Sequence, residues 1–238
     1  MRIDKFLHDQ QFGTRSEVHA LIKARKVTLN GLAVKSFKVD VDPENDHVTV
    51  AGEAVVVQAS FVYYLLNKPT GVITATEDSY QATVMGLISL EDRRTDLFPV
   101  GRLDKDTTGI LLLTNDGQLA HRLVSPKHHV EKTYLVETTG ELTSAQLRVL
   151  QKGVTLRDGA QVQADQCELI AAQDDRSTVR ITLHQGKYHQ IKRMIGYLGE
   201  RVTRLHRESF AQLSDAKLAV GTYRPLTEQE LTQLKASK

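Results

Sequence analysis

Apolar residues recur at helical spacing near the start of the chain. Ile3, Phe6 and Leu7 predict a short first helix, which Gly13 should end. Thr14 should open a second helix, because a glutamate three positions later completes a capping box. The apolar face of this second helix consists of Val18, Leu21 and Ile22.

Short β-like segments follow these two helices. They are Val27–Leu29 and Val48–Val50, and the first runs into an Asn30-Gly31 turn, which is a good hairpin signal. The two helices and the hairpin predict a compact N-terminal domain over residues 1–58, with a second domain over residues 59–238.

From residue 61 the pattern mixes apolar strand-like runs with amphipathic segments in irregular order. Strands are expected at 61–66, 110–114, 133–138, 178–184 and 202–206. Helices are expected at 117–124, 143–151, 188–198 and 227–235. Because the order lacks regular strand–helix–strand repeats, the expected fold class is α+β, with a mixed, largely antiparallel sheet.

Composition narrows the class of protein. The 238 residues include one cysteine, Cys167, which excludes an intramolecular disulfide framework and a multi-cysteine metal site. Apolar runs stay well below the roughly 18 residues of a membrane helix, and the first ten residues lack the apolar stretch of a signal peptide. We therefore expect a cytoplasmic protein with no membrane partner.

The formal net charge of +2 conceals a strong polarisation along the chain. Residues 1–38 carry eight Lys/Arg and three acids, whereas residues 39–60 carry five acids and no Lys/Arg. A third segment, 186–210, carries six Lys/Arg and two acids. On the second helix, Arg15, His19, Lys23 and Lys26 recur at steps of four, four and three, which predicts one basic stripe on the face opposite its apolar residues.

The segment richest in candidate catalytic residues is the loop 99–109, in which two glycines bracket Asp104 and Asp106. A calcium loop is rejected, because its twelfth position here is Asn115 and its middle is apolar. A phosphatase of the haloacid-dehalogenase type stays open as a minor alternative, with Asp174 and Asp175 as its later acidic pair. A zinc site is disfavoured, because His128 and His129 are adjacent and no cysteine is close.

The whole string GRLDKDTTGILLLTNDG resembles the catalytic loop of RNA pseudouridine synthases. The resemblance extends to the motifs that begin at Asn67 (NKPTG), Glu131 (EKTYLV), Gly186 (GKYHQIKRM) and Val202 (VTRLHR), in the family's order. Segments 125–136 and 221–226 resemble the RsuA family, which modifies small-subunit rRNA. The pattern of residues 4–31 resembles the small RNA-binding module named after the fourth small-subunit ribosomal protein.

The resemblance implies roles for individual residues. It makes Asp104 the catalytic carboxylate and Lys192 the cation that keeps it charged and oriented. It makes Tyr134 and Leu205 the residues that pack on the two sides of an extruded base, and Arg102 the side chain that helps to hold that base out of the RNA stack. Arg193 is expected to assist substrate binding. Expected RNA contacts of the N-terminal module are Arg2, Lys5, Arg15, Lys23, Arg25 and Lys26.

The expected reaction detaches uracil from its sugar and rejoins it through carbon 5, with no cofactor and no metal. The expected partner is ribosomal RNA or a small-subunit assembly particle, the expected target is uridine 516 of 16S rRNA, and the protein is expected to be a monomer. Besides the phosphatase interpretation, two alternatives remain: the same chemistry at a 23S rRNA site, and a non-catalytic rRNA-binding assembly protein.

Overall fold

The computed structural model describes residues 1–56, 61–125, 130–214 and 217–236 of the chain. The chain divides into two compact units, Met1–Phe61 and Val62–Lys238, each with its own hydrophobic core. The expected domain boundary at 58/59 falls within residues 57–60, which lie outside the described residues. Within the described ranges, no helix is long and apolar enough to cross a membrane.

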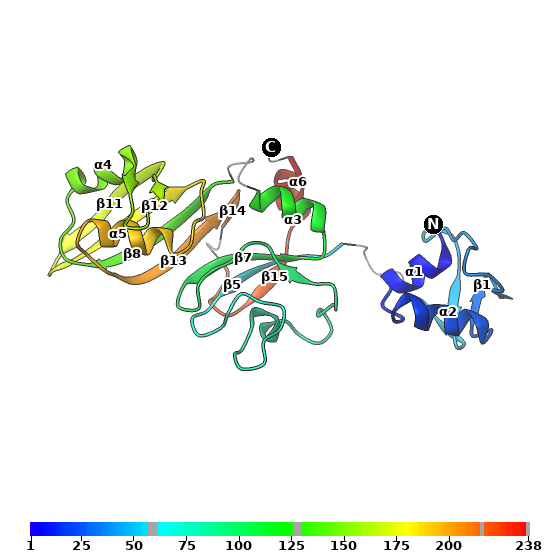
Figure 1. Ribbon diagram of the computed structural model, residues 1–238. Helices are drawn as coiled ribbons and strands as arrows, with labels where there is room; N and C mark the ends of the chain where they lie inside the picture. Colours follow the sequence, from blue (N-terminus) through cyan, green and yellow to red (C-terminus); the bar gives the residue numbers. More distant parts are fainter. Residues whose placement is uncertain (57–60, 126–129, 215–216, 237–238) are drawn as a thin grey trace. The chain divides into compact units, whose positions relative to one another are not determined.

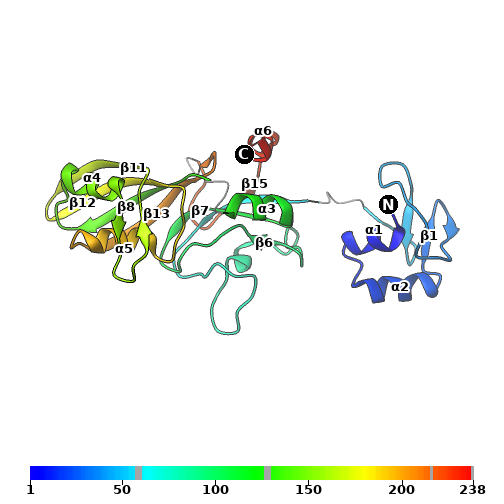
Figure 2. The ribbon, with the colours of Figure 1, turned by 45° about the horizontal axis from the view of Figure 1, so that its top comes forward.

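The N-terminal unit consists of two helices and a small sheet (Figure 2). The helices are α1 (Ile3–Asp9) and α2 (Arg15–Lys23), and the strands are β1 (Val27–Leu29), β2 (Leu32–Ala33), β3 (Val48–Val50) and β4 (Glu53–Ala54), in the order β2-β1-β3-β4. The capping box is present, since the Thr14 hydroxyl accepts from the Glu17 backbone N–H and the Glu17 carboxylate accepts from the Thr14 N–H. The predicted hairpin is confirmed, with positive φ at Asn30 and Gly31.

The second unit is built on a nine-stranded sheet (Figure 1). Its main path is β11-β12-β8-β13-β7-β5-β15, with β6 added beside β7 and β14 beside β13. The strands on this path are β11 (Gln166–Gln173), β12 (Arg176–Leu183), β8 (Lys132–Thr139), β13 (Val202–Phe210), β7 (Thr108–Thr114), β5 (Tyr63–Lys68) and β15 (Tyr223–Pro225). The added strands are β6 (Phe98–Pro99) and β14 (Leu213–Ser214), and a separate hairpin pairs β9 (Val154–Thr155) with β10 (Gln161–Val162).

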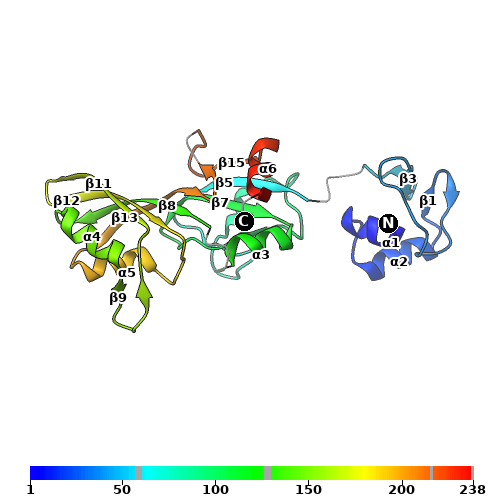
Figure 3. The same ribbon diagram turned by 90° about the horizontal axis from the view of Figure 1, so that it is seen from above.

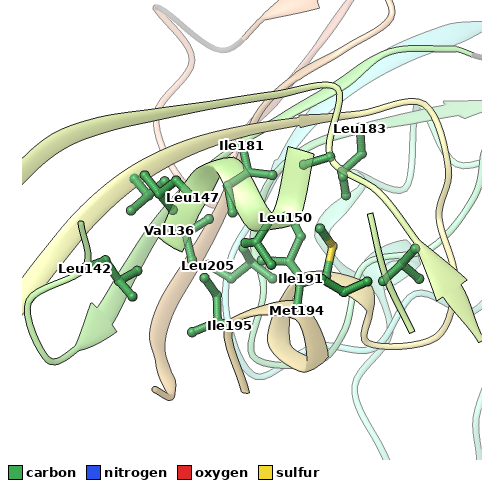
Figure 4. Close-up of a cluster of buried hydrophobic side chains, with 14 of the residues drawn as sticks. Val136, Leu142, Leu147, Leu150, Ile181, Leu183, Ile191, Met194, Ile195 and Leu205 are labelled. Atoms are coloured by element: carbon green, nitrogen blue, oxygen red, sulfur yellow. The ribbon is translucent and has the colours of Figure 1, made fainter. Parts of the chain in front are cut away.

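Helices cover the sheet in two groups. On one half, α4 (Ser144–Lys152) and α5 (Gln190–Tyr197) lie on the same side of β12, β8 and β13 (Figure 3). Figure 4 shows Leu147 and Leu150 of α4 and Ile191 and Ile195 of α5 packed against side chains of these strands. On the other half, α3 (Gly117–Val124) and α6 (Glu228–Ala236) cover one face of β5 and β7, and the segment 72–103 with the 3-10 helix η1 (Val84–Leu87) covers the other.

The fold class is confirmed: the sheet is mixed and largely antiparallel, within an α+β unit. Each strand expected beyond residue 100 lies on an observed strand to within about two residues at most ends, although β13 runs on to Phe210. The long strand β11 was not predicted. Its sequence QCELIAAQ alternates polar and apolar residues only over 166–169, and the exposed apolar residues 170–172 then break the pattern by which a strand is identified.

The parallel pairing of β7 with β13 joins the two halves of the sheet. It spans only His206↔Thr108 and Arg207↔Gly109. At Gly109, where φ is +108°, a Cβ atom would collide with the backbone of Arg207. The Arg207 side chain is buried, and its Nε donates to the carbonyl of Ile110 at 2.7 Å. Glycine is therefore required where β7 begins.

We expect Gly109→Ala to lower the free energy of unfolding of the second unit by about 3 kcal/mol or more, since it combines positive-φ strain with a backbone clash. The matched control is Gly159→Ala, because Gly159 has φ of +80° with nothing near its Cβ position. Urea denaturation followed by circular dichroism checks both variants. Equal losses of unfolding free energy in the two variants would show that φ strain alone matters and that the close approach of Gly109 to the Arg207 backbone does not.

Candidate active site

The loop that carries Asp104 is held from below by a buried lysine. Lys68, at the end of β5, is fully buried, and its Nζ donates to the carbonyls of Asp104 at 3.0 Å and Thr107 at 2.8 Å. A third bond runs to the carbonyl of Pro69 at 3.0 Å. Burial lowers the pKa of Lys68 to about 8, against the opposing influence of the Asp106 and Asp104 charges. The lysine thus fixes the main chain on either side of the two carboxylates.

Helix α5 brings a cation to the Asp104 carboxylate. Lys192 Nζ lies 3.1 Å from Asp104 Oδ2 and donates to both Asp106 oxygens, at 2.7 and 2.9 Å. Burial disfavours charge on Lys192, but the hydrogen bonds and charges of the two carboxylates outweigh it and raise its pKa. The Lys192 hydrogen bond in turn lowers the pKa of Asp106. One ammonium therefore orients both acidic side chains.

A histidine completes the surroundings of Asp104. His189 Nε2 lies 3.5 Å from Asp104 Oδ2, one helical turn before Lys192 on the chain. Its backbone adopts the left-handed conformation, with φ of +48°, at the N-cap of α5. The sequence placed this residue within a motif but gave no signal for its contact with Asp104, because the contact depends on that local turn.

Two strands supply the walls of the pocket above Asp104. Tyr134 on β8 pairs with Arg207 of β13, and Leu205 of β13 pairs with Val136 of β8. Tyr134 and Leu205 are therefore diagonal neighbours on the same face of the sheet. Both line a pocket together with Asp104, Lys192 and the exposed Arg102. The structure thus gathers five of the six residues expected at the substrate in one place.

Arg193 is the sixth expected residue, and it is not part of this pocket. Its guanidinium pairs with Asp158 in the turn between β9 and β10 and lines a separate cavity with Arg157 and Tyr197. The reason is helical geometry, because the next position along α5 points about 100° away from Lys192. The expectation that Arg193 assists substrate binding stays a prediction, and it would have to act from this separate cavity.

The competing interpretations of the loop find no support. Asp104 follows the two-residue strand β6, which pairs antiparallel with β7, whereas the phosphatase arrangement needs a buried parallel strand before the aspartate. Asp174 and Asp175 form the turn of the β11–β12 hairpin. Among the described residues no cluster of His, Cys, Asp and Glu could hold a metal ion, and His128 and His129 lie outside them.

The expected RNA contacts of the N-terminal unit divide into two groups. Arg15, Lys23, Arg25 and Lys26 are exposed. Arg2 and Lys5 instead pair with carboxylates of their own helix, Asp4 and Asp9 respectively, each at 2.7 Å.

His19 corrects the expected basic stripe on α2. Its Nε2 lies 3.2 Å from an Asp4 oxygen and its ring stacks on Phe37, so it joins α2 to α1 and to the loop beyond β2. The exposed cations on and directly after α2 are therefore the arginine at its start and the three cations at and after its end.

Comparison with known proteins fits this geometry. The model of the family described as RNA pseudouridylate synthase matches residues 62–196, and the model of the S4 domain matches residues 1–48. The chain belongs to the RNA pseudouridine synthase family and is an enzyme of the isomerase type that acts on RNA.

Relatives in this family match along nearly the whole chain. An uncharacterized RNA pseudouridine synthase of Bacillus subtilis, YtzG, is 45% identical over 97% of both chains. Proteins named ribosomal small subunit pseudouridine synthase A from Yersinia pestis and Escherichia coli are 40% and 38% identical, over at least 98% of either chain. A crystal structure of a pseudouridylate synthase aligns with a TM-score of 0.65 at 36% identity, over 98% of this chain and 99% of that one.

We expect Lys68→Met to destabilise the loop below Asp104, because a buried amine is lost and several carbonyls are left unpaired. The free energy of unfolding should fall by about 2–4 kcal/mol, and pseudouridine formation should fall with it. The control is Lys152→Met on the exposed face of α4, which should change stability by less than about 0.5 kcal/mol. Urea titration checks both, and an unaffected Lys68→Met protein would contradict the bracing role.

Proposed function

We propose that this protein converts a single uridine of 16S rRNA to pseudouridine, with uridine 516 as the target and Asp104 as the catalytic carboxylate. The observation that carries the proposal is the pocket itself, in which a one-third exposed carboxylate is held by Lys192 beneath Tyr134 and Leu205. The full-length similarity to enzymes named ribosomal small subunit pseudouridine synthase A supports the choice of rRNA.

The pocket suits a flat base that has been turned out of the RNA. Tyr134 and Leu205 both line it, so that a base entering the pocket would meet the tyrosine ring and the leucine side chain. Arg102, exposed at the same pocket, is suited to fill the gap that the extruded base leaves in the strand.

Asp104 performs the chemistry as an ionised group in this proposal. A carboxylate can attack the sugar or the base as a nucleophile, or remove a proton from the ribose, and each role requires the charged form. The ammonium of Lys192 at 3.1 Å pairs with this carboxylate and fixes the direction of its oxygen atoms. Tyr134 packs on the base and offers a phenol for proton transfer.

The N-terminal unit contributes affinity for the RNA backbone. Arg15, Lys23, Arg25 and Lys26 are exposed, and no acidic partner is seen for them among the described residues. Contacts of this type position an RNA but carry no sequence information. The protein is proposed to act as a monomer in the cytoplasm.

Asp104→Asn should abolish pseudouridine formation, because the amide can neither attack nor accept a proton. The matched control is Asp106→Asn, since Asp106 binds the same ammonium but is 72% exposed at its side chain. We expect that control to keep activity within about tenfold of the parent. The measurement is pseudouridine mapping of rRNA from cells that lack this protein and carry each variant.

The mapping also separates the alternatives. A lost modification at a 23S position would move the target to the large subunit, and full modification by Asp104→Asn would remove Asp104 from the chemistry. Unchanged modification in cells without the protein would favour a non-catalytic rRNA-binding role.

Neutralising Arg15, Lys23, Arg25 and Lys26 together as glutamine should weaken RNA binding and reduce the slope of log K against log salt. Each lost phosphate contact should lower the slope by about 0.7–0.9. Arg2→Gln with Lys5→Gln is the comparison, because those cations already have acidic partners. Fluorescence anisotropy between low and high salt measures both slopes. If the slope changed equally in the fourfold and the twofold variants, the exposed cations would have no special role in RNA binding.

A further inference from the structure

An exposed tyrosine stacks on His189, which lines the pocket, and is absent from the proposed mechanism. Tyr188 is 76% exposed, although large aromatic side chains usually bury most of their surface. One face of its ring is covered, because it stacks on His189 with centroids 3.8 Å apart and an angle of 19°. The opposite face carries no ring contact within the described structure.

The turn that holds Tyr188 is fixed by its neighbours. Gln190 is buried, its side-chain oxygen accepts from the Lys187 backbone N–H at 2.9 Å, and its own N–H donates to the Lys187 carbonyl at 3.1 Å. The Tyr188 carbonyl accepts from Arg193 Nη1 at 3.4 Å. The tyrosine is therefore positioned before any ligand arrives, which reduces the entropy lost on binding.

The stacked pair reaches from the solvent to the reacting carboxylate. His189 lines the pocket and lies 3.5 Å from Asp104, and the ring of the exposed Tyr188 stacks on that histidine. Lys187, which precedes the pair, lines the same pocket and adds positive charge. An aromatic platform beside cations is the combination by which proteins bind unpaired nucleotides.

We propose that the open face of Tyr188 stacks on the base of a nucleotide adjacent to the flipped uridine, so that His189, Tyr188 and this base form one continuous stack. The occupant is a nucleobase of the substrate RNA. It lies next to the gap in base stacking that the flipped uridine leaves. His189 acts as a positioning residue for the tyrosine. The inference rests on the proposed extrusion of the target base.

The test uses the rRNA fragment in which pseudouridine formation has been mapped, and the full-length protein. Tyr188→Ala should raise KM roughly tenfold and leave kcat within about twofold, whereas Tyr188→Phe should match the parent. The control is Tyr197→Ala. Tyr197 is the last residue of α5, the helix that follows Tyr188, and it is 53% exposed and lies outside the pocket that holds Asp104. The exposure of Tyr188 means that its removal should leave thermal unfolding unchanged.

Abasic nucleotides identify the base that is stacked. One is placed directly before and one directly after the target uridine, in separate RNAs. At one of these two positions the abasic RNA should raise KM by itself, and Tyr188→Ala should add no further effect. The proposal is overturned if Tyr188→Ala forms pseudouridine with an unchanged KM, or if its effect multiplies with the abasic effect at both positions. If the parent protein formed no pseudouridine in the intact RNA fragment, the proposed function itself would be refuted.

Discussion

The architecture depends on a close backbone contact between Gly109 and Arg207. Two residues of parallel pairing there join the antiparallel strands β11, β12, β8 and β13 to the antiparallel strands β7, β5 and β15. The same contact fixes the end of the Asp104 loop against the strand that carries Leu205. The buried Arg207 guanidinium, bonded to Ile110 and 5.0 Å from the centre of the Phe210 ring, stabilises the junction from inside.

The pocket is assembled from parts that are distant in sequence but rigid in space. Asp104 comes from a loop braced by Lys68, Tyr134 and Leu205 come from neighbouring strands, and Lys192 comes from a helix packed on the sheet. Regular elements hold side chains more precisely than loops do. The one contributor outside a regular element, the loop 100–107, is held at its main chain by Lys68, while Lys192 holds the Asp104 carboxylate in the pocket.

Much of this arrangement could be predicted from the sequence, and the failures have physical causes. The capping box at Thr14, the Asn30 hairpin and the buried strand β7 depend on local patterns, so they were predicted correctly. Strand β11 was missed because its alternation of polar and apolar residues stops after Leu169 and most of its side chains are exposed.

At the site, motifs identified which residues matter but not how they meet. Lys68 and His189 lay within quoted motifs, yet their contacts with the Asp104 loop depend on burial and on a left-handed turn that spacing does not encode. His19 and Arg193 show the converse. Each lies in a basic run, but each pairs with a nearby carboxylate, which sequence charge alone does not reveal.

The separate cores of the two units have a consequence for how the protein evolves. Ile3, Phe6, Val18 and their neighbours form the N-terminal core without side chains from the larger unit. A substitution within this core therefore acts first on the N-terminal unit, since the catalytic sheet has its own set of buried side chains. Mutations in the N-terminal core can then change RNA affinity, and mutations in the core of the larger unit can change catalytic activity.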